Sequence, residues 1–391
     1  MNPTSVRALL SLVVVFVMLA TTGWTALRPG GGSDPRSVAV SAWKRGTIGV
    51  RKLPALDSAP GTIARFFASL TGAQRRRLAD RYALVVGNLN GAPIALRYRA
   101  NAHALRAARA AARARAHSDT MTAAGRRDAA RRAARYTSLL GGHRQILAFD
   151  PTGNGLAAEV FGDLAGAKRV AVVVPGVDTN VLTFERTDRS YAAPVGMAEA
   201  LHDEELAVAP RSRTAVIAWA DYTTPTGVGL DASTAALAER GATRLEGLLS
   251  ALPQRHDVAL FCHSYGSVLC GVAAPDLVEG QVSDITVFGS PGMRARDVGQ
   301  LHTGAHIWAA RDSGDWISDV PHLEFAGLGH GADPVSASFG ARVISAAGAQ
   351  GHPGYFAPDT ASLANFTEIA LGDYAQVACD GVASSCTAGL A

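Results

Sequence analysis

The stretch Phe261-Cys-His-Ser-Tyr-Gly-Ser267 lies where an apolar run ends and a helical pattern begins. Residues 258–262 predict a buried strand, and the residues from 268 onward predict a helix. A sharp turn between two such elements would project the Ser264 hydroxyl above the carboxyl edge of a sheet. The turn needs small residues two positions to either side of the serine, which Cys262 and Gly266 supply, although glycine is more usual at position 262. Ser264 is therefore the candidate nucleophile, and an ordinary strand–helix turn that happens to contain a serine is the alternative.

Short strand patterns alternate with helical patterns from about residue 145 onward. The continuous apolar runs at 170–174 and 258–261 are typical of strands that are covered on both faces. This alternation favours an α/β fold with a mostly parallel central sheet. The expected strands are residues 145–149, 157–161, 169–174, 214–219, 258–262, 284–288, 306–310 and a last one near 343–346, and the clearest expected helices are residues 231–252 and 362–371.

Two backbone N–H groups are candidates for an oxyanion hole. The expected strand 170–174 ends in Pro175-Gly176-Val177-Asp178-Thr179, which places a turn containing Val177 where one donor is expected. The N–H of Tyr265, directly after the candidate nucleophile, would be the second donor. A Pro-Gly pair is also a common turn, so the side chains there add little.

An acid and then a histidine should follow the serine along the chain. Asp312 and Asp315 both lie in the loop after the expected strand 306–310, and Asp315 is the preferred acid. His352 is the preferred base because it follows the expected last strand and precedes the final helix. His322 also lies nearby, and His330 is the alternative base. The choice of acid and the choice of base both stay open at this point.

The catalytic half of the chain resembles the α/β-hydrolase superfamily. More closely, the chain resembles an actinobacterial family of exported α/β-hydrolases of uncharacterised function, over roughly residues 59–372. The resemblance implies that Ser264, Asp315 and His352 form a catalytic triad. Its motifs here are Gly87-Asn-Leu-Asn-Gly-Ala-Pro93 with Arg97 and Ala100-Asn101, Pro175-Gly176, His263-Ser-Tyr-Gly-Ser267, Gly289-Ser-Pro-Gly292, Gly314-Asp-Trp-Ile317, His330-Gly-Ala-Asp-Pro334 and Gly351-His-Pro-Gly-Tyr355.

We therefore expect a serine esterase that cleaves a small-molecule or lipid carboxylic ester through an acyl-enzyme. Esters are favoured over amides because an alkoxide leaves more easily than an amide nitrogen. One rival is an acyltransferase that uses the same triad with an alcohol acceptor, and another is an exported binding protein that keeps the fold without catalysis. We expect no cofactor and no metal, because His322 and His330 lack the spacing of a helical metal motif.

Composition limits the remaining classes of function. The chain has 391 residues, of which 48% are hydrophobic, so it can bury a sizeable core. The net charge is only +4 and aromatic residues make up 6%, which argues against a nucleic-acid partner. The sequence does not predict an oligomeric state.

The N-terminus predicts export. Arg7 precedes the apolar run 8–20, which has the length of a signal-peptide core, and a softer stretch continues to Leu27. The whole stretch could just span a bilayer, and no clear cleavage site precedes Arg28-Pro-Gly-Gly-Gly32. We therefore interpret residues 1–32 as a signal peptide or membrane anchor with a Gly-rich linker, and the protein as secreted or membrane-anchored.

Residues 33–144 are expected to form a helical region after an irregular lead-in that extends to about residue 54. Thr71 and Gln74 fit a capping box at a helix start. The stretch 94–140 carries many arginines among alanines and is interrupted near His117. It predicts a solvated helix pair, or alternatively a surface for anionic lipid or cell-envelope polymer.

The catalytic domain is expected at residues 145–375, followed by a tail at 376–391. Cys379 and Cys386 could close a small loop in this tail if the compartment is oxidising. Cys262 and Cys270 flank the candidate nucleophile and could be buried thiols or a second bridge. Geometry decides between these pairings, so both remain open.

Overall fold

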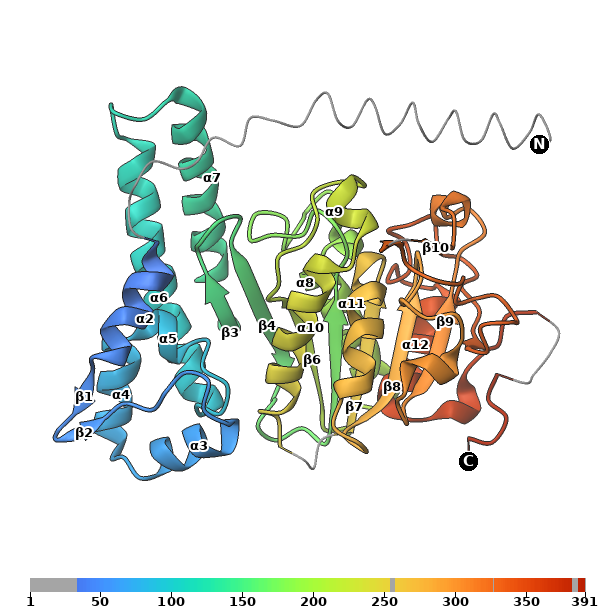
Figure 1. The fold of residues 1–391 in the computed structure, drawn as a ribbon, viewed down its shortest axis with the longest axis horizontal. Coiled ribbons are helices and arrows are strands. Elements are labelled where there is room, and N and C mark those ends of the chain that lie inside the picture. The colour runs from blue at the N-terminus through green and yellow to red at the C-terminus, as the bar shows by residue number, and fades with distance from the viewer. Residues whose placement is uncertain (1–33, 254–256, 326, 382–385, 391) are drawn as a thin grey trace. The chain divides into compact units, whose positions relative to one another are not determined.

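A twisted, mostly parallel β-sheet forms the centre of the fold (Figure 1). The computed structural model describes residues 34–253, 257–325, 327–381 and 386–390. Within these residues the large sheet has eight strands in the order β12-β9-β8-β7-β5-β6-β4-β3. The strands are β3 (Gln145–Asp150), β4 (Leu156–Gly162), β5 (Arg169–Val174), β6 (Thr214–Ala220), β7 (Asp257–His263), β8 (Val282–Phe288), β9 (His306–Ala310) and β12 (Arg342–Val343).

Six neighbouring strands of this sheet run parallel, namely β6, β5, β7, β8, β9 and β12. Strands β4 and β3 add an antiparallel edge. This topology confirms the prediction of an α/β fold with a mostly parallel sheet. The carboxyl ends of β5, β7, β8 and β9 meet at one edge, where ligands bind in open α/β sheets.

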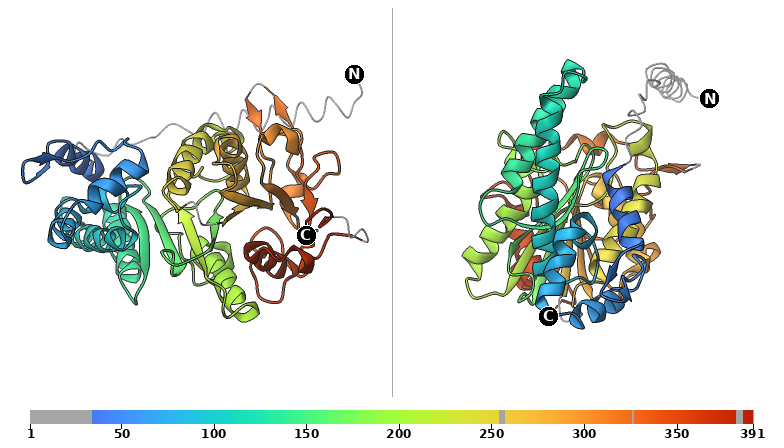
Figure 2. Two further views of the ribbon diagram at one scale, coloured as in Figure 1. Left: turned by 90° about the horizontal axis from the view of Figure 1, so that it is seen from below. Right: turned by 90° about the vertical axis from the view of Figure 1, so that its left-hand side faces the viewer.

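Helices cover both faces of the sheet (Figure 2). On β5, Val170, Val172 and Val174 enter one apolar core, whereas Ala171 and Val173 enter the other, as the period of two in a strand requires. One face carries α10 (Ala236–Leu249) and α11 (Tyr265–Ala273), and the other carries α8 (Pro194–Val208) and α12 (Ala361–Leu371).

A helical region flanks the antiparallel edge and has a third apolar core, in which Trp43, Ile63 and Phe67 are buried. Its docking onto β3 uses the Gly87–Gly91 turn and helix α6 (Ile94–Ala116). The Asn88 side chain exchanges hydrogen bonds with the Phe149 backbone, and Asn101 Nδ2 donates to the Gly87 and Ile146 carbonyls. The helices are α2 (Pro35–Lys44), α3 (Pro60–Ala68), α4 (Gly72–Arg81), α5 (Ala83–Val86), α6 (Ile94–Ala116) and α7 (Ala123–Leu139).

Two helix starts in this region follow the sequence closely. Thr71 and Gln74 form the predicted capping box, in which each side chain bonds the backbone N–H of the other residue. The break near His117 is also present, and Thr122 caps the new helix by accepting the Gly125 N–H.

The irregular lead-in expected before residue 54 is wrong. Pro35 opens helix α2, a position that suits proline because its missing N–H has no partner there. Trp43 anchors this helix, since its ring is buried and its Nε1 donates to the Pro54 carbonyl at 2.7 Å. A small hairpin of β1 (Thr47–Ile48) and β2 (Arg51–Lys52) follows.

The single helix expected at 231–252 is divided into α9 (Leu230–Ser233) and α10. The Ser233 hydroxyl bonds back to the Leu230 carbonyl, and Thr234 adopts an extended backbone. The Thr234 carbonyl then accepts the Tyr265 hydroxyl at 2.7 Å instead of a helical N–H. Competing local hydrogen bonds of this kind end helices.

The last strand is shorter than expected. Strand β12 covers only Arg342–Val343, and Ile344 pairs with Cys379 in an isolated bridge. This bridge holds the C-terminal tail against the sheet edge, where the Cys379–Cys386 disulfide closes the predicted loop. The second disulfide, Cys262–Cys270, joins the end of β7 to α11, so Cys262 and Cys270 are not free thiols.

The described part of the chain contains no helix that is long and apolar enough to cross a bilayer. The predicted export segment at 1–32 lies outside the described residues. Pro35–Ala391 packs as one unit, so the helical region and the sheet share a continuous body. The boundary expected at residues 144 and 145 stays a prediction.

Candidate active site

Ser264 lies at the predicted sharp turn between β7 and α11. Its backbone has φ 54° and ψ −125°, a conformation that costs a non-glycine residue about 1–3 kcal/mol. The turn is tight because a Cβ on Gly266 would come within 2.5 Å of the Val174 carbonyl oxygen. The Ser264 N–H donates to the Phe288 carbonyl at 3.1 Å, which ties the turn to β8.

The Ser264 hydroxyl makes no hydrogen bond to any residue that the structure describes. The residue itself is only 5% exposed. A strained, ordered turn therefore presents a hydroxyl whose hydrogen-bonding capacity is unused.

Asp315 and His352 form a close pair in the loops beyond β9 and β12. His352 Nδ1 lies 2.9 Å from Asp315 Oδ1 and 3.1 Å from Oδ2. Since the carboxylate can only accept, the imidazole Nδ1 donates, and Nε2 is the nitrogen left for a substrate or nucleophile.

Three donors converge on the buried Asp315 carboxylate. Burial alone would raise its pKa, but hydrogen bonds from His352, the Tyr355 hydroxyl and the Ile317 N–H outweigh burial and lower the pKa. The Tyr355 hydroxyl donates to Oδ2 at 2.6 Å and itself accepts the Asp312 N–H. The carboxylate is therefore held ionised in a fixed orientation.

The residue after β8 brings this pair to the serine turn. A Cβ on Gly289 would lie 3.0 Å from both Asp315 Oδ2 and His352 Nδ1, so glycine leaves room for the imidazole. Gly289 directly follows Phe288, whose carbonyl accepts the Ser264 N–H. The serine turn and the Asp315–His352 pair thus meet at the carboxyl edge of β8.

His263 contacts the backbone of the loop that carries His352. Its Nε2 donates to the His352 carbonyl at 2.9 Å, and the two ring centroids are 4.6 Å apart. Burial lowers the pKa of His263 to about 3, with a further decrease from the neighbouring His352. His263 is therefore neutral and acts as a structural support for the His352 backbone.

The two alternative residues occupy other positions. Asp312 Oδ2 accepts the Gly314 and Gly351 N–H groups, so this carboxylate holds together the two loops that carry Asp315 and His352. His330 Nε2 donates to the Ala232 carbonyl at 2.6 Å, and its ring packs edge-on against Tyr265. The structure brings Asp315 and His352 together. Among the described residues, Asp312 is hydrogen-bonded to no imidazole and His330 to no carboxylate.

The Val177 turn lies beside the serine. A Cβ on Gly176 would be 2.6 Å from Ser264 Cβ and 3.0 Å from Oγ, so the turn and the serine are in direct contact. The Tyr222 hydroxyl donates to the Pro175 carbonyl, and the Asp178 N–H donates to the Pro225 carbonyl. In the described structure, neither the Val177 nor the Tyr265 backbone N–H donates a hydrogen bond to another residue.

A family model described as "Alpha/beta hydrolase" matches residues 150–325. Over this segment the chain is similar to α/β-hydrolases. The matched segment contains the Ser264 turn and Asp315 but ends before His352. The described residues contain no cluster of three His, Cys, Asp or Glu side chains that could hold a metal ion.

The chain is also similar to mycobacterial proteins that are described as uncharacterised. An uncharacterised protein of Mycobacterium tuberculosis is 28% identical over 389 residues, which cover 83% of this chain and 58% of the relative. An uncharacterised protein of Mycobacterium bovis is 33% identical over 152 residues, which cover 37% of this chain and 56% of the relative. The chain thus spans less than two thirds of the length of these relatives.

Solved structures of α/β-hydrolases align with parts of the chain. A lidless serine hydrolase from Xanthomonas campestris aligns at 16% identity and a TM-score of 0.30, over 44% of this chain and 73% of that structure. A serine hydrolase homologue from Coxiella burnetii aligns at 11% identity and a TM-score of 0.29, over 56% of this chain and 91% of that structure.

Sequence reasoning missed three residues that shape the site. Gly289, His263 and Tyr355 each lie in a quoted motif, but nothing in the sequence indicated which groups they would contact. Tyr355 lies three residues after His352, and this spacing is a weak signal that both side chains contact the loop that carries Asp315.

Proposed function

We propose that the protein is a serine hydrolase that cleaves carboxylic esters through an acyl-enzyme on Ser264. The observation that carries this proposal is the Asp315–His352 pair beside a strained serine turn. An imidazole whose Nδ1 is fixed by a carboxylate is the usual base for a serine nucleophile.

His352 Nε2 would take the Ser264 proton as Oγ attacks the ester carbonyl carbon. Asp315 would hold the imidazole in the required tautomer and stabilise the imidazolium without taking its proton. The imidazolium would then protonate the departing alkoxide, and water activated by His352 would hydrolyse the acyl-enzyme. Hydrogen bonds between nucleophile and base commonly tighten only when substrate binds.

The N–H groups of Val177 and Tyr265 would stabilise the tetrahedral oxyanion. Support comes from their lack of partners in the described structure and from the contact between Gly176 and Ser264. Each such donor typically contributes about 3–4 kcal/mol to lowering the barrier. The Tyr222 and Asp178 hydrogen bonds would keep the turn in position for this role.

Exposed apolar side chains in the segments around the site favour an apolar or lipid ester. Trp316 is 46% exposed, and its ring centroid lies 4.8 Å from that of His352. Leu230 is exposed in the segment that carries Ala232, the hydrogen-bond partner of His330. Before His330, Leu323 is exposed next to β10 (Glu324–Phe325), and Leu328 is exposed in β11 (Leu328–Gly329). Exposed apolar residues that gather near a site mark ligand or lipid contact.

We further propose that the protein acts outside the cytoplasm. The Cys262–Cys270 and Cys379–Cys386 disulfides support this location, because structural disulfides persist in oxidising compartments. The predicted export segment at residues 1–32 is consistent with it.

Hydrolysis of p-nitrophenyl esters of increasing acyl length by the wild type and Ser264→Ala tests the activity. We expect the wild type to prefer medium or long acyl chains and Ser264→Ala to lose at least about 10⁴-fold in kcat. Ser313→Ala, an exposed serine in the loop after β9, is the matched control and should keep wild-type activity. Equal hydrolysis by the wild type and Ser264→Ala would overturn the proposal.

Adding an alcohol to the same assay distinguishes a hydrolase from an acyltransferase. A hydrolase releases mainly free acid, whereas an acyltransferase with this triad would release mainly the ester of the added alcohol. Product analysis therefore separates the two reactions without a new variant.

A further inference from the structure

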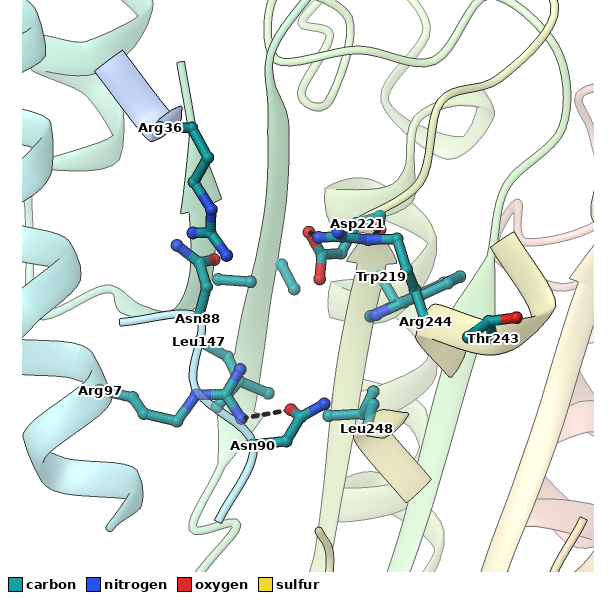
Figure 3. Close-up of a pocket in the computed structure, with 12 residues that line it drawn as sticks. Arg36, Asn88, Asn90, Arg97, Leu147, Trp219, Asp221, Thr243, Arg244 and Leu248 are labelled. Atoms are coloured by element: carbon teal, nitrogen blue, oxygen red, sulfur yellow. Dashed lines mark hydrogen bonds and ion pairs between the residues drawn. The ribbon is translucent and has the colours of Figure 1, made fainter. Parts of the chain in front are cut away.

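A polar cavity of about 190 Å³ lies between the helical region and the sheet (Figure 3). Its lining comes from α2, the Gly87–Gly91 turn, α6, strands β3, β4 and β6, and α10. None of the residues that line it belongs to the Ser264 site. A cavity of this size holds several water molecules, so it can admit a small polar ligand.

Arg97 is the most buried of the three arginines that line this cavity. The residue is only 5% exposed, and no carboxylate of the described residues lies within 4.0 Å of its guanidinium. A buried charge without an ionic partner is costly, and such charges are usually paired. Burial lowers the pKa of Arg97 to about 10, and the neighbouring Asp221 opposes this decrease, so the guanidinium is still charged at neutral pH.

Several donors around Arg97 remain available. Arg97 Nε donates to the Gly87 carbonyl at 3.1 Å and Nη1 lies 3.4 Å from Asn90 Oδ1. Arginine has five N–H donors, so three of them have no acceptor among the described residues. The Asn90 amide nitrogen also donates to none of these residues. A group that accepts hydrogen bonds and carries negative charge would satisfy these donors and pair the guanidinium.

The other cations of the cavity lie nearer to solvent. Arg244 pairs with Asp221 at 2.5 Å, and the Arg244 side chain is 38% exposed. Arg36 lies 3.9 Å from Asp150, with 26% of its side chain exposed. Figure 3 shows Arg36 and Arg97 extending from the helical side, with Arg244 and Asp221 on the opposite side. The lining thus has three guanidinium groups and one carboxylate, and Asp150 outside the lining pairs with Arg36. Among the lining residues, Arg97 is the guanidinium without a carboxylate within 4.0 Å.

Docking of the helical region does not account for this arrangement. The Asn88 and Asn101 side-chain amides donate hydrogen bonds to carbonyls of β3 and so help to dock the helical region. Arg97 and Asn90 instead contact the turn and each other, and their remaining donors face the cavity.

We propose that this cavity binds a phosphate group, either as free phosphate or as part of a phosphate ester. The guanidinium fork suits an oxyanion, and donors on opposite walls suit a tetrahedral anion better than a planar carboxylate. Arg97 and Asn90 would bind the innermost oxygens, and Arg36 and Arg244 would compensate the remaining charge near the mouth.

Calorimetric titration of the full-length chain with inorganic phosphate at constant ionic strength tests this site. We expect saturable binding to the wild type, at least about tenfold weaker binding to Arg97→Gln, and little response to acetate. Arg131→Gln removes the same charge from an exposed position on α7 and should bind phosphate like the wild type.

An exposed position and a partly buried one test the electrostatics without replacing Arg97 itself. Asp221→Asn removes the only carboxylate of the lining and should tighten phosphate binding, whereas Thr243→Glu adds one at the mouth and should weaken it. These opposite shifts keep the test decisive even if Arg97→Gln does not fold.

Glycerol phosphate identifies the source of the group. Tighter binding of glycerol phosphate than of phosphate supports a phosphate ester as the ligand, and equal binding supports the free anion. Absence of saturable phosphate binding to the wild type at tens of millimolar would overturn the proposal, and so would equal affinity in the wild type, Asp221→Asn and Thr243→Glu.

Discussion

His352 and His330 lie in turns of similar composition but face different partners. Each histidine directly follows a glycine with positive φ. Each ring also packs against a residue next to Ser264, His352 against His263 and His330 against Tyr265. His352 Nδ1 donates to the Asp315 carboxylate, whereas His330 Nε2 donates to the Ala232 carbonyl. The His330 Nδ1 atom is buried and has no hydrogen-bond partner among the described residues. A carboxylate can stabilise an imidazolium, and a single carbonyl in a buried site does so far less.

The difference teaches that the partner of a histidine, not the loop that carries it, decides whether it can act as a base. Burial lowers the pKa of His330, a shift that the Ala232 hydrogen bond only partly opposes. His330 therefore stays neutral and serves packing against Tyr265. The Asp315–His352 pair is the one arranged for proton transfer.

Replacement of each histidine by alanine gives the largest expected contrast. His352→Ala should lower kcat for a p-nitrophenyl ester by about 10⁴-fold or more, because the serine loses its base. His330→Ala should change kcat by less than about tenfold, because it removes a packing contact with Tyr265 and a hydrogen bond to the Ala232 carbonyl but no partner of the Asp315–His352 pair. Comparable losses in both variants would remove the distinction between the two turns.

The two carboxylates sharpen the same comparison. Asp315→Asn should lower kcat by about 10³–10⁴-fold, since an amide cannot fix the imidazole tautomer or stabilise its cation. Asp312→Asn keeps an acceptor for the Gly314 and Gly351 N–H groups and should cost far less. Steady-state kinetics of both variants measures this, and a larger loss for Asp312→Asn would reassign the acid.

The third histidine, His263, predicts a dependence of stability on pH. Its folded pKa of about 3 lies below the unfolded value near 6.5, so only the unfolded chain binds the proton between these values. The wild type should therefore lose about 1.4 kcal/mol per pH unit from this residue as the pH falls through that window.

His263→Gln should lack this contribution, so its unfolding free energy should fall less steeply from pH 6.5 to pH 4.5, by roughly 2–3 kcal/mol in total. Urea unfolding of both proteins at several pH values measures the difference. Parallel curves for the wild type and His263→Gln would contradict the assignment of a neutral, buried His263.

Removal of the Tyr355 hydroxyl is expected to lower activity less than loss of His352 or of the Asp315 carboxylate. Tyr355→Phe deletes one of three hydrogen bonds to Asp315 and should lower kcat by about tenfold with little change in KM. Tyr374→Phe is the matched control. The Tyr374 hydroxyl donates to Asp284 Oδ2 over 2.9 Å, and neither residue belongs to the Ser264 site. Equal kcat values in the two variants would show that Tyr355 does not position the acid.

Sequence patterns predicted the parts of the fold that depend on neighbouring residues. Apolar runs located the strands, and the stretch 261–267 predicted the sharp turn at Ser264, since strand, turn and helix follow one another along the chain. The capping box at Thr71 is local in the same sense.

The features that the sequence did not settle depend on contacts between distant segments. The choice between Asp312 and Asp315 rests on the position of residues almost 40 places further along the chain. The break after α9 reflects the Tyr265 hydroxyl bonding the Thr234 carbonyl, and the start of α2 reflects burial of Trp43 in the helical region. Periodicity along the chain contains no information on such partners.

Labelling with a fluorophosphonate, mapped by mass spectrometry, tests the central claim most directly, because the reagent reacts with activated serines. We predict that the full-length protein is modified on Ser264, and that labelling disappears in Ser264→Ala and falls sharply in His352→Ala. A folded wild type that is not labelled, or that is labelled on another serine, would contradict the account.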